Sequence, residues 1–296
     1  GEILGVVGES GCGKSVTSQS IMRLYDEKRT ARYSGEILLN GDNLLKKTEK
    51  EMREIRGRDV AMVFQDALSS LNPVIKIGEQ IMEPLRIHQH MKKKEARERA
   101  LEMLRLVGIP APEDRLEQYP HELSGGMRQR VMIAIALACQ PKLLIADEPT
   151  TALDVTIQAQ IMDLIVELNQ SLSMGVILIT HDLAVVAETC SRVVVMYLGQ
   201  IVEEADVNDL FDNPMHPYTN GLIQSIPKLN GNRKEHLYTI EGMVPLLNQI
   251  PKGCRFAPRC PYATELCRNK MPELEMISDT QKVRCFYAAE RGEMSV

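Results

Sequence analysis

The sequence predicts an α/β protein with a sheet covered on both faces, an inserted block of helices and a loop-rich C-terminal tail that contains cysteines. Three observations predict this fold class. Short apolar runs alternate with stretches of helical periodicity, one long segment is helical throughout, and four of the seven cysteines lie beyond residue 253. With 296 residues, of which 44% are hydrophobic and 25% charged, the chain can bury a full core and carry an appendage.

The expected strands are short and apolar, as in a sheet covered by helices on both sides. They cover residues 2–7, 60–64, 143–146, 176–180 and 193–198. Helical patterns occupy intervals between them, at residues 14–24, 156–171 and 183–190. This alternation is typical of an α/β fold.

The segment from residue 78 to residue 138 breaks this alternation. Helical periodicity runs through residues 78–87, 93–107 and 125–138, and the helices are separated by Pro110, Pro112 and Pro120. We therefore expect a helical subdomain inserted at about residues 66–138. The longest apolar run, residues 131–139, has the length of a buried helix and falls short of the ~20 residues that span a bilayer. Any membrane association would therefore need partner proteins.

The charge of the chain argues against a nucleic-acid-binding surface, because the formal net charge is −5. We expect no nucleic acid among the partners. The one dense basic tract, Lys92-Lys93-Lys94, opens a predicted helix with alternating Glu and Arg, and we interpret it as a solvated helix face. The sequence starts directly in an expected strand, without Met or signal peptide, and we expect a further segment upstream of it.

Residues 8–15, Gly-Glu-Ser-Gly-Cys-Gly-Lys-Ser, match the phosphate-loop pattern GxxxxGK[ST] between an expected strand and an expected helix. The glycines let the backbone amides turn inward, and the helix start adds a partial positive charge for a phosphate. Lys14 supplies a point charge to the β- and γ-phosphates, Ser15 offers a hydroxyl to Mg²⁺, and Cys12 fills space in the loop. The predicted nucleotide-binding residues are Gly8, Ser10, Gly11, Cys12, Gly13, Lys14, Ser15 and Val16.

Two carboxylates follow the strand expected at residues 143–146. Asp147 ends this strand at the carboxyl edge of the sheet, where a nucleotide should lie, so we assign it to Mg²⁺, directly or through water. Successive side chains of a strand point to opposite sides, so Glu148 needs another role. We assign Glu148 to polarising the attacking water. The alternative is an acidic residue near the start of the following helix.

Gln65 and His181 each follow an expected strand, so both should reach the same edge of the sheet. The amide of Gln65 can touch Mg²⁺ and the lytic water together. Taken alone, His181 would more often be a strand-end histidine in an ordinary hydrogen bond. Its place in the series of phosphate-handling motifs leads us to assign it, with Gln65 and Glu148, to catalysis.

Residues 123–126, Leu-Ser-Gly-Gly, open the helix expected at residues 125–138. The free backbone amides and the helix dipole create a second anion site, formed by Ser124, Gly125 and Gly126. Since Lys14 already serves the γ-phosphate in its own chain, this second site is expected to cap a nucleotide held by a partner subunit. The alternative is that Ser124 is a plain helix cap with glycine neighbours.

The order of these motifs resembles that of the ATP-binding subunits of ABC transporters. Residues 8–15 correspond to Walker A, Gln65 to the Q-loop, residues 123–126 to the signature, Asp147 to the end of Walker B, residues 152–154 with Asp154 to the D-loop, and His181 to the switch histidine. The resemblance covers about residues 1–205 and implies a P-loop ABC ATPase core with an inserted helical subdomain. Residues 213–219, Asn-Pro-Met-His-Pro-Tyr-Thr, look like the extension motif of the oligopeptide and dipeptide importer ATPases, most of all the dipeptide-permease type. The extension would then be residues 206–296.

This resemblance implies an ATPase that converts ATP and water to ADP and phosphate and powers the import of dipeptides or oligopeptides. It implies a head-to-tail dimer with a second ATPase subunit, a paralogue or a copy of itself, around two ATP molecules. Two transmembrane permease subunits would bind in a groove lined by residues 66–84, and an extracellular or periplasmic peptide-binding protein would deliver the solute. The chain would then lie peripherally on the cytoplasmic face of the cell membrane. The rival interpretation is a soluble ABC ATPase of iron–sulfur cluster assembly.

Four tail cysteines, Cys254, Cys260, Cys267 and Cys285, are spaced more widely than the tight pairs of structural zinc sites. The spacing alone leaves zinc, an iron–sulfur cluster and free thiols open. The resemblance to the importer ATPases implies a [4Fe-4S] cluster, with zinc, which would make the tail a docking module, as the alternative. The arginines beside these cysteines would offset thiolate charge or form solvated surface; they are Arg255, Arg259 and Arg268.

Overall fold

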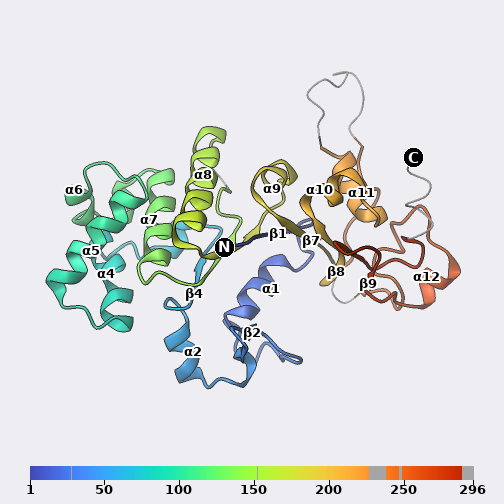
Figure 1. Cartoon of the computed structure of the whole chain (residues 1–296), viewed down its shortest axis with the longest axis horizontal. Coiled ribbons are helices and arrows are strands. Elements are labelled where there is room, and N and C mark those ends of the chain that lie inside the picture. Colours follow the sequence, from blue (N-terminus) through green and yellow to red (C-terminus); the bar gives the residue numbers. More distant parts are fainter. Residues whose placement is uncertain (28, 152, 227–237, 247–248, 289–296) are drawn as a thin grey trace. The chain divides into compact units, whose positions relative to one another are not determined.

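The computed structural model describes residues 1–27, 29–151, 153–226, 238–246 and 249–288 (Figure 1). These residues form two compact units. The first unit contains residues 1–2 and 15–178, and the second contains residues 3–14 together with the part of the chain from residue 179 onward. The expected α/β fold is confirmed, and each unit is built from strands and helices in turn.

In the first unit, strand β5 (Leu143–Asp147) lies between β4 (Val60–Val63) and β6 (Gly175–Ile179). Strands β4 and β5 run parallel, with Val60 opposite Leu143. All four residues of β4 are buried, as are the last four of β5. These strands match the expected ones to within one residue at each end, because a strand buried on both faces is recognisable as a short apolar run.

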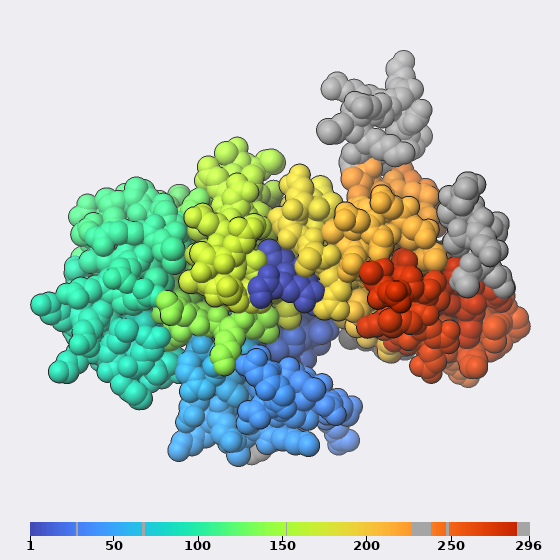
Figure 2. All heavy atoms as spheres, viewed as in Figure 1, coloured from blue at the N-terminus to red at the C-terminus, as the bar shows by residue number. Residues whose placement is uncertain are grey.

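The expected run of helices is confirmed in the same unit. It consists of α3 (Ala67–Ser70), α4 (Ile77–His88), α5 (Lys93–Leu106), α6 (Pro112–Leu116) and α7 (Gly125–Leu137). Helices α4, α5 and α7 pack against one another, and α7 also contacts β4. Figure 2 shows this segment as one continuous block of side chains, coloured cyan to green. Ile81, Leu104 and Val131 are fully buried in it, whereas Lys92, Lys93 and Lys94 are exposed, as expected of a solvated helix face.

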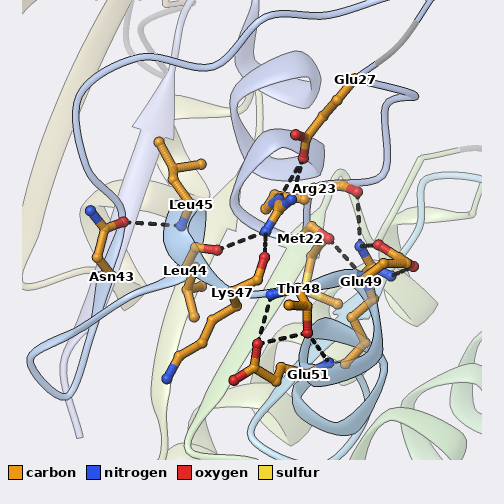
Figure 3. A network of polar contacts seen from close by, with 11 residues as sticks. Met22, Arg23, Glu27, Asn43, Leu44, Leu45, Lys47, Thr48, Glu49 and Glu51 are labelled. Atoms are coloured by element: carbon orange, nitrogen blue, oxygen red, sulfur yellow. Dashed lines mark hydrogen bonds and ion pairs between the residues drawn. The ribbon is translucent and has the colours of Figure 1, made fainter.

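A polar network joins the end of α1 (Lys14–Ile21) to the segment that follows it (Figure 3). This segment contains β2 (Leu38–Leu39), β3 (Asp42–Asn43), the 3₁₀ turn η1 (Leu44–Lys46) and α2 (Glu49–Ile55). Arg23 donates to the carbonyls of Leu44 at 2.9 Å and Lys47 at 2.6 Å. Thr48 and Glu51 form a capping box that starts α2. These hydrogen bonds satisfy backbone groups that a two-stranded ribbon and two short helices cannot satisfy alone.

The last long helix of the first unit is α8 (Val155–Leu172), which begins at the side-chain cap of Asp154. Its buried side chains recur at helical spacing, as Ile161, Ile165 and Leu168 show. The expected helix at residues 156–171 is therefore confirmed.

In the second unit, β1 (Ile3–Val7) runs parallel to β7 (Arg192–Tyr197), and α9 (Leu183–Thr189) packs against β1. Strand β8 (Gln200–Asp206) returns antiparallel to β7 through a two-residue turn. The turn residues Leu198 and Gly199 have φ angles of 46° and 73°. Positive φ at both central residues is the requirement of a type I′ hairpin.

The C-terminal tail adds two strands to β8, which the sequence did not predict. They are β10 (Gln281–Val283), antiparallel to β8, and β9 (Glu275–Met276), antiparallel to β10. The described part of this unit also contains the short helices α10 (Val207–Asp212), α11 (Pro217–Gln224) and α12 (Glu265–Asn269). The tail is rich in loops, but these loops connect elements that extend the sheet (Figure 1).

Strand β8 escaped prediction because it carries a buried carboxylate. Glu203 has no exposed surface and accepts hydrogen bonds from the backbone N–H groups of Met215 and His216, both at 2.9 Å. The side chain of Gln281 in β10 donates a third bond at 2.8 Å. Burial raises the pKa of Glu203 above its usual value, and these three bonds are what allow a carboxyl group in the core.

None of the helices in the described part of the chain is long and apolar enough to cross a membrane.

Candidate functional site

The phosphate loop between β1 and α1 adopts a conformation that only glycine permits at its first position. Gly8 has φ 150°, and a Cβ atom there would lie 2.3 Å from the carbonyl oxygen of Met196 and 2.8 Å from Cys12 Sγ. Cys12 itself is buried, as expected for a residue that fills space, and burial raises the pKa of its thiol. Its carbonyl accepts a 2.7 Å hydrogen bond from the N–H of Gly199 in the β7–β8 turn. The loop is therefore held on its inner side by the hairpin.

Lys14 is buried at the start of α1, and its ammonium group faces the loop. It donates to the carbonyl of Gly8 at 2.8 Å and to that of Glu9 at 3.2 Å. Ser10 is exposed at the loop tip and Val16 is 55% exposed on α1. An ammonium group at a helix N-terminus with exposed loop residues before it is an arrangement that suits an anionic phosphate chain.

In the first unit, Ser15 and Asp147 are brought together. Ser15 Oγ donates to Asp147 Oδ1 at 3.0 Å, and Ser18 Oγ lies 3.5 Å from the other carboxylate oxygen. Asp147 is the last residue of β5 and is 3% exposed. A hydroxyl and a carboxylate oxygen side by side are ligands that Mg²⁺ accepts, with phosphate and water completing its shell.

Gln65 and Glu148 are likewise brought into contact. Gln65 Nε2 donates to Glu148 Oε2 at 2.8 Å, and the hydroxyl of Thr151 donates to the same oxygen at 3.0 Å. Glu148 has φ 47°, a left-handed conformation directly after the strand. The carboxylates of Asp147 and Glu148 therefore lie in different environments. The reason is the turn of the chain after β5 and not the expected alternation of side chains along a strand.

His181 lies in the second unit, in the bend before α9, and its side chain is exposed. The next residue, Asp182, caps α9 by accepting from the N–H groups of Ala184 at 2.9 Å and Val185 at 3.3 Å. The N–H of Asp182 is held in turn by the hydroxyl of Thr180 at 3.0 Å. The bend that carries His181 is thus fixed by local hydrogen bonds on its C-terminal side.

The signature residues and Asp154 surround one hollow in the first unit, of about 520 Å³. Ser124 caps α7 by accepting from Met127 N at 3.3 Å, and Asp154 caps α8 by accepting from Ile157 N at 3.0 Å. The two helix starts therefore face the same space, together with Gly125, Gly126 and the cation Arg130. Ala152, the first residue of the expected D-loop, lies outside the described residues.

Ser124 is thus a helix cap, but its surroundings are richer than those of a plain one. Two helix N-termini and a guanidinium group meet around this hollow, and each of them favours an anion. Gly126 is required there by close approach, since a Cβ atom would lie 2.8 Å from Ile157 Cγ2.

The four tail cysteines line one small cavity of about 20 Å³ in the second unit. The backbone N–H of Cys254 donates to the carbonyl of Cys267 at 2.8 Å, and Thr264 Oγ1 lies 3.4 Å from Cys267 Sγ. Burial raises the pKa of Cys254 to about 11. Across the described ranges, no three His, Cys, Asp or Glu side chains are placed to hold a single metal ion. The structure therefore does not support the expected metal site at the four tail cysteines, although the four side chains line one cavity.

Sequence reasoning missed the residues that support the phosphate loop from the tail. Arg259 is neither solvated surface nor a counter-charge for thiolates: its side chain is 4% exposed and pairs with Glu9 of the loop at 2.6 Å. Arg255 donates to the carbonyl of Leu198 in the β7–β8 turn. Tyr218 contacts Glu9 as well, and its place in the expected 213–219 motif was the one available signal.

Two family profiles match the chain. Residues 1–151 match the family described as ABC transporter, and residues 202–267 match the C-terminal region of the oligopeptide/dipeptide transporter family. The first match contains the phosphate loop, Gln65, the signature residues, Asp147 at the end of β5 and Glu148 after it. The second contains Tyr218 and three of the four tail cysteines.

Curated relatives match over nearly the whole chain. A probable peptide ABC transporter ATP-binding protein of Sinorhizobium fredii is 56% identical over 98% of this chain and 87% of its own length. An oligopeptide transport ATP-binding protein of Bacillus subtilis is 54% identical over 99% and 89%, respectively. A dipeptide transport ATP-binding protein of Escherichia coli is 51% identical over 97% and 87%.

Among solved structures, the dimeric post-hydrolysis state of an ATP-binding cassette bound to ADP and phosphate aligns with a TM-score of 0.62. The two chains share 31% sequence identity, and the alignment covers 70% of this chain and 85% of that cassette. Fold, family profiles and near full-length identity agree. The chain belongs to the ATP-binding proteins of the ABC transporter family, in the branch that carries the oligopeptide/dipeptide transporter C-terminal region.

Proposed function

We propose that this chain is the ATP-hydrolysing subunit that powers the import of dipeptides or oligopeptides across a membrane. The observation that carries this proposal is a pair of contacts at the end of β5. Asp147 meets Ser15, with which it is proposed to hold Mg²⁺, and the next residue, Glu148, meets Gln65 and is proposed to polarise the attacking water. The curated relatives named for peptide transport support the substrate class. None of these relatives is named for iron–sulfur cluster assembly, so the rival function has no support.

Each site residue has a role in this proposal. The amides of residues 8–13 and Lys14 bind the β- and γ-phosphates of ATP. Ser15 and Asp147 would hold Mg²⁺, with Gln65 as a further ligand, and the ion would neutralise phosphate charge. Glu148 accepts the proton of the attacking water, and Gln65 and Thr151 orient its carboxylate. His181, in the bend before α9, is the third proposed catalytic residue.

The second anion site is proposed to serve a partner subunit. Ser124, Gly125, Gly126 and Asp154 would contact the ATP bound by the phosphate loop of a neighbouring chain, in a head-to-tail dimer. The hollow that these residues share contains helix starts but no lysine of its own, which supports a nucleotide supplied from outside. The solved cassette described above is a dimer by its own title.

Membrane coupling is proposed to occur through two permease subunits, with the chain lying peripherally on the cytoplasmic face and a peptide-binding protein on the other side. Residues 66–84, where the groove for a permease helix is expected, include two exposed apolar side chains. Val74 is 78% exposed and Ile75 is 39% exposed. Exposed apolar groups next to one another are typical of an interaction surface.

The tail cysteines are proposed to hold a [4Fe-4S] cluster. A tetrahedral zinc ion with bonds of about 2.3 Å needs its thiolates to converge on one point, whereas a cubane binds each thiolate through a separate iron atom. The observation that supports this proposal is that all four thiols line one cavity. The test is metal and sulfide analysis of the purified chain. Iron and acid-labile sulfide that are lost in Cys260→Ser but retained in the control Cys139→Ser, outside the tail, would support the cluster. Zinc alone would refute it.

Replacing Glu148 by Gln tests the proposed chemistry. We expect the kcat for ATP hydrolysis to fall at least about 100-fold, because general-base catalysis contributes that much, while ATP binding is preserved. The matched control is Glu98→Gln, an exposed glutamate of α5 that should leave turnover unchanged. Full ATPase activity of Glu148→Gln would contradict the assignment.

The solute is tested in the assembled transporter. Co-purification with the permease subunits, followed by ATPase assays with the binding protein and added solute, should show stimulation by dipeptides or oligopeptides. Stimulation by a nickel complex alone would overturn the proposed substrate class and leave the ATPase assignment standing.

A further inference from the structure

The phosphate loop contains a carboxylate that is tied to the C-terminal tail. Glu9 is the second residue of the loop, and its carboxylate oxygens accept from Arg259 Nη1 at 2.6 Å and Nη2 at 3.0 Å. Both parallel bonds of the guanidinium fork are therefore formed, which is the strongest geometry for this pair. Within the second unit, the tail thus reaches back to the loop across 250 residues of sequence.

The same loop residue is held a second time through its backbone. The N–H of Glu9 donates to the hydroxyl of Tyr218 at 2.8 Å. Tyr218 is fully buried in α11, and its own N–H is held by His216 Nδ1 at 3.1 Å. Both the main chain and the side chain of Glu9 are therefore fixed by residues that lie far away in the sequence.

Arg259 is rigidly placed for this contact. Its remaining donors bond to the carbonyls of Glu241 at 2.9 Å, Ile240 at 3.2 Å and Gly242 at 3.3 Å, and its guanidinium lies 5.8 Å from the ring centre of Tyr197. The turn that presents it is short, since the N–H groups of Arg259 and Cys260 both donate to the carbonyl of Phe256.

The turn that carries Arg259 begins at Phe256, which belongs to an aromatic cluster of Tyr197, His216, Tyr218 and Phe256. The ring centres of Tyr197 and Tyr218 are 4.7 Å apart, and Phe256 lies 5.2 Å and 5.3 Å from these two rings. Phe256 is 2% exposed. Packed aromatic rings resist rotation, so the positions of Arg259 and Tyr218 are set together.

A carboxylate in a phosphate-binding loop needs this pairing. An unpaired Glu9 would repel the triphosphate, because like charges repel one another. Arg259 cancels that charge and orients it at the same time. Since Glu9 is adjacent to Gly8, the pair also restrains the start of the loop, where a side chain would not fit.

We propose that Arg259 is a positioning residue for ATP binding: together with Tyr218 it clamps Glu9, neutralises its charge and so makes the cysteine-bearing tail a structural support of the phosphate loop. This inference rests on the proposed ATPase function. It also gives the tail a defined effect on the site, because Arg259 directly precedes Cys260.

The test is a rescue experiment on the full chain with a non-hydrolysable ATP analogue and Mg²⁺. Arg259→Met, which keeps the apolar stem, should weaken analogue binding about tenfold, with a larger change in KM for ATP than in kcat. The double variant Glu9→Gln with Arg259→Met should recover most of the affinity, since the unpaired carboxylate is gone. Hydrogen exchange of residues 8–13 should rise in Arg259→Met.

The control is Arg268→Met, an exposed arginine beside another tail cysteine, which should bind the analogue like the original chain. If Arg259→Met does not fold, Arg259→Lys replaces it in the same affinity comparison. Lysine keeps the positive charge but loses the two parallel hydrogen bonds of the guanidinium group, so we expect binding about threefold weaker than in the original chain. Unchanged affinity in Arg259→Met overturns the clamp. A loss that Glu9→Gln fails to rescue also overturns it, because Arg259 would then act only through the tail carbonyls.

These outcomes are separable from failure of the proposed function. A chain that hydrolyses ATP normally with either variant at position 259 contradicts the clamp and leaves the ATPase standing. A chain that binds the analogue but never hydrolyses ATP contradicts the proposed function, and the rescue experiment can still be scored by binding.

Discussion

At the scale of single residues, the backbone conformation of Asp147 and Glu148 decides which side chains their carboxylates contact. Glu148 turns away from β5 in a left-handed conformation, and the amide of Gln65 and the hydroxyl of Thr151 meet its carboxylate. Asp147, one residue earlier, stays in the strand and meets Ser15. One backbone torsion thus separates a carboxylate suited to metal from one suited to water, which supports the two roles proposed for them.

Gly126 gives a prediction at the residue scale. Changing Gly126 to Ala would place a Cβ atom 2.8 Å from Ile157 Cγ2, and a β-branched neighbour on a helix has little freedom to move. We expect unfolding in urea at a lower midpoint, with a loss of about 1–3 kcal/mol in stability, as for other overpacked sites.

The neighbouring glycine is the matched control for that substitution. A Cβ atom at Gly125 would lie 3.6 Å from Leu153, an ordinary contact, and alanine is favoured over glycine in a helix by about 0.5–1 kcal/mol. Gly125→Ala should therefore unfold at an equal or higher midpoint. Equal destabilisation by both variants would contradict the close approach of α7 and α8 as its cause.

At the scale of elements, the clearest discrepancy between sequence and structure concerns strands. Strands β1, β4, β5, β6 and β7 were predictable because burial makes them largely apolar, with charged residues only at the end of β5 and the start of β7. Strand β8 contains Glu203 and Glu204, and nothing in its local pattern indicates that one of these carboxylates is fully buried. Its partner β10 lies about eighty residues away in the sequence, with Glu204 opposite Lys282.

The motif at residues 213–219 owes its conformation to that missed strand. Glu203 accepts from the N–H groups of Met215 and His216, and His216 in turn caps α11, which begins at Pro217. Tyr218 then reaches Glu9 of the phosphate loop. The extension motif is therefore a bridge between a buried carboxylate in β8 and the loop, a role that its sequence does not reveal.

At the scale of the whole molecule, the chain contains two candidate anion sites, one in each unit. The phosphate loop offers a lysine and a helix start, while the hollow at α7 and α8 offers helix starts with Arg130. The proposed head-to-tail dimer would use the first site for the nucleotide of the same chain and the second for the nucleotide of its partner.

The dimer gives a prediction at this scale. Glu148→Gln in the presence of ATP and Mg²⁺ should sediment as a dimer of this chain, because bound nucleotide is retained between the subunits. Adding Ser124→Arg, at an exposed position on the signature helix, should return it to a monomer with ATP still bound. A Glu148→Gln chain that remains monomeric at saturating ATP would contradict closure between two copies.

The sequence by itself determined the α/β class and the helical insertion, and it supplied the residues proposed to bind phosphate. These depend on local information: apolar periodicity, glycine spacing and the order of motifs along the chain. The contacts Gln65–Glu148 and Ser15–Asp147 follow from strands that end at one edge, so the sequence could anticipate that these residues would meet.

Only the tertiary structure decided that the tail supports the phosphate loop. Arg259 and Glu9 are both common surface residues, and no periodicity or spacing links them. Their pairing depends on the aromatic cluster, on the β8–β10 pairing and on the turn before Cys260, which are contacts between segments far apart in the chain. Such contacts arise from packing in three dimensions, and the strand and helix periodicities of two and 3.6 residues do not predict them.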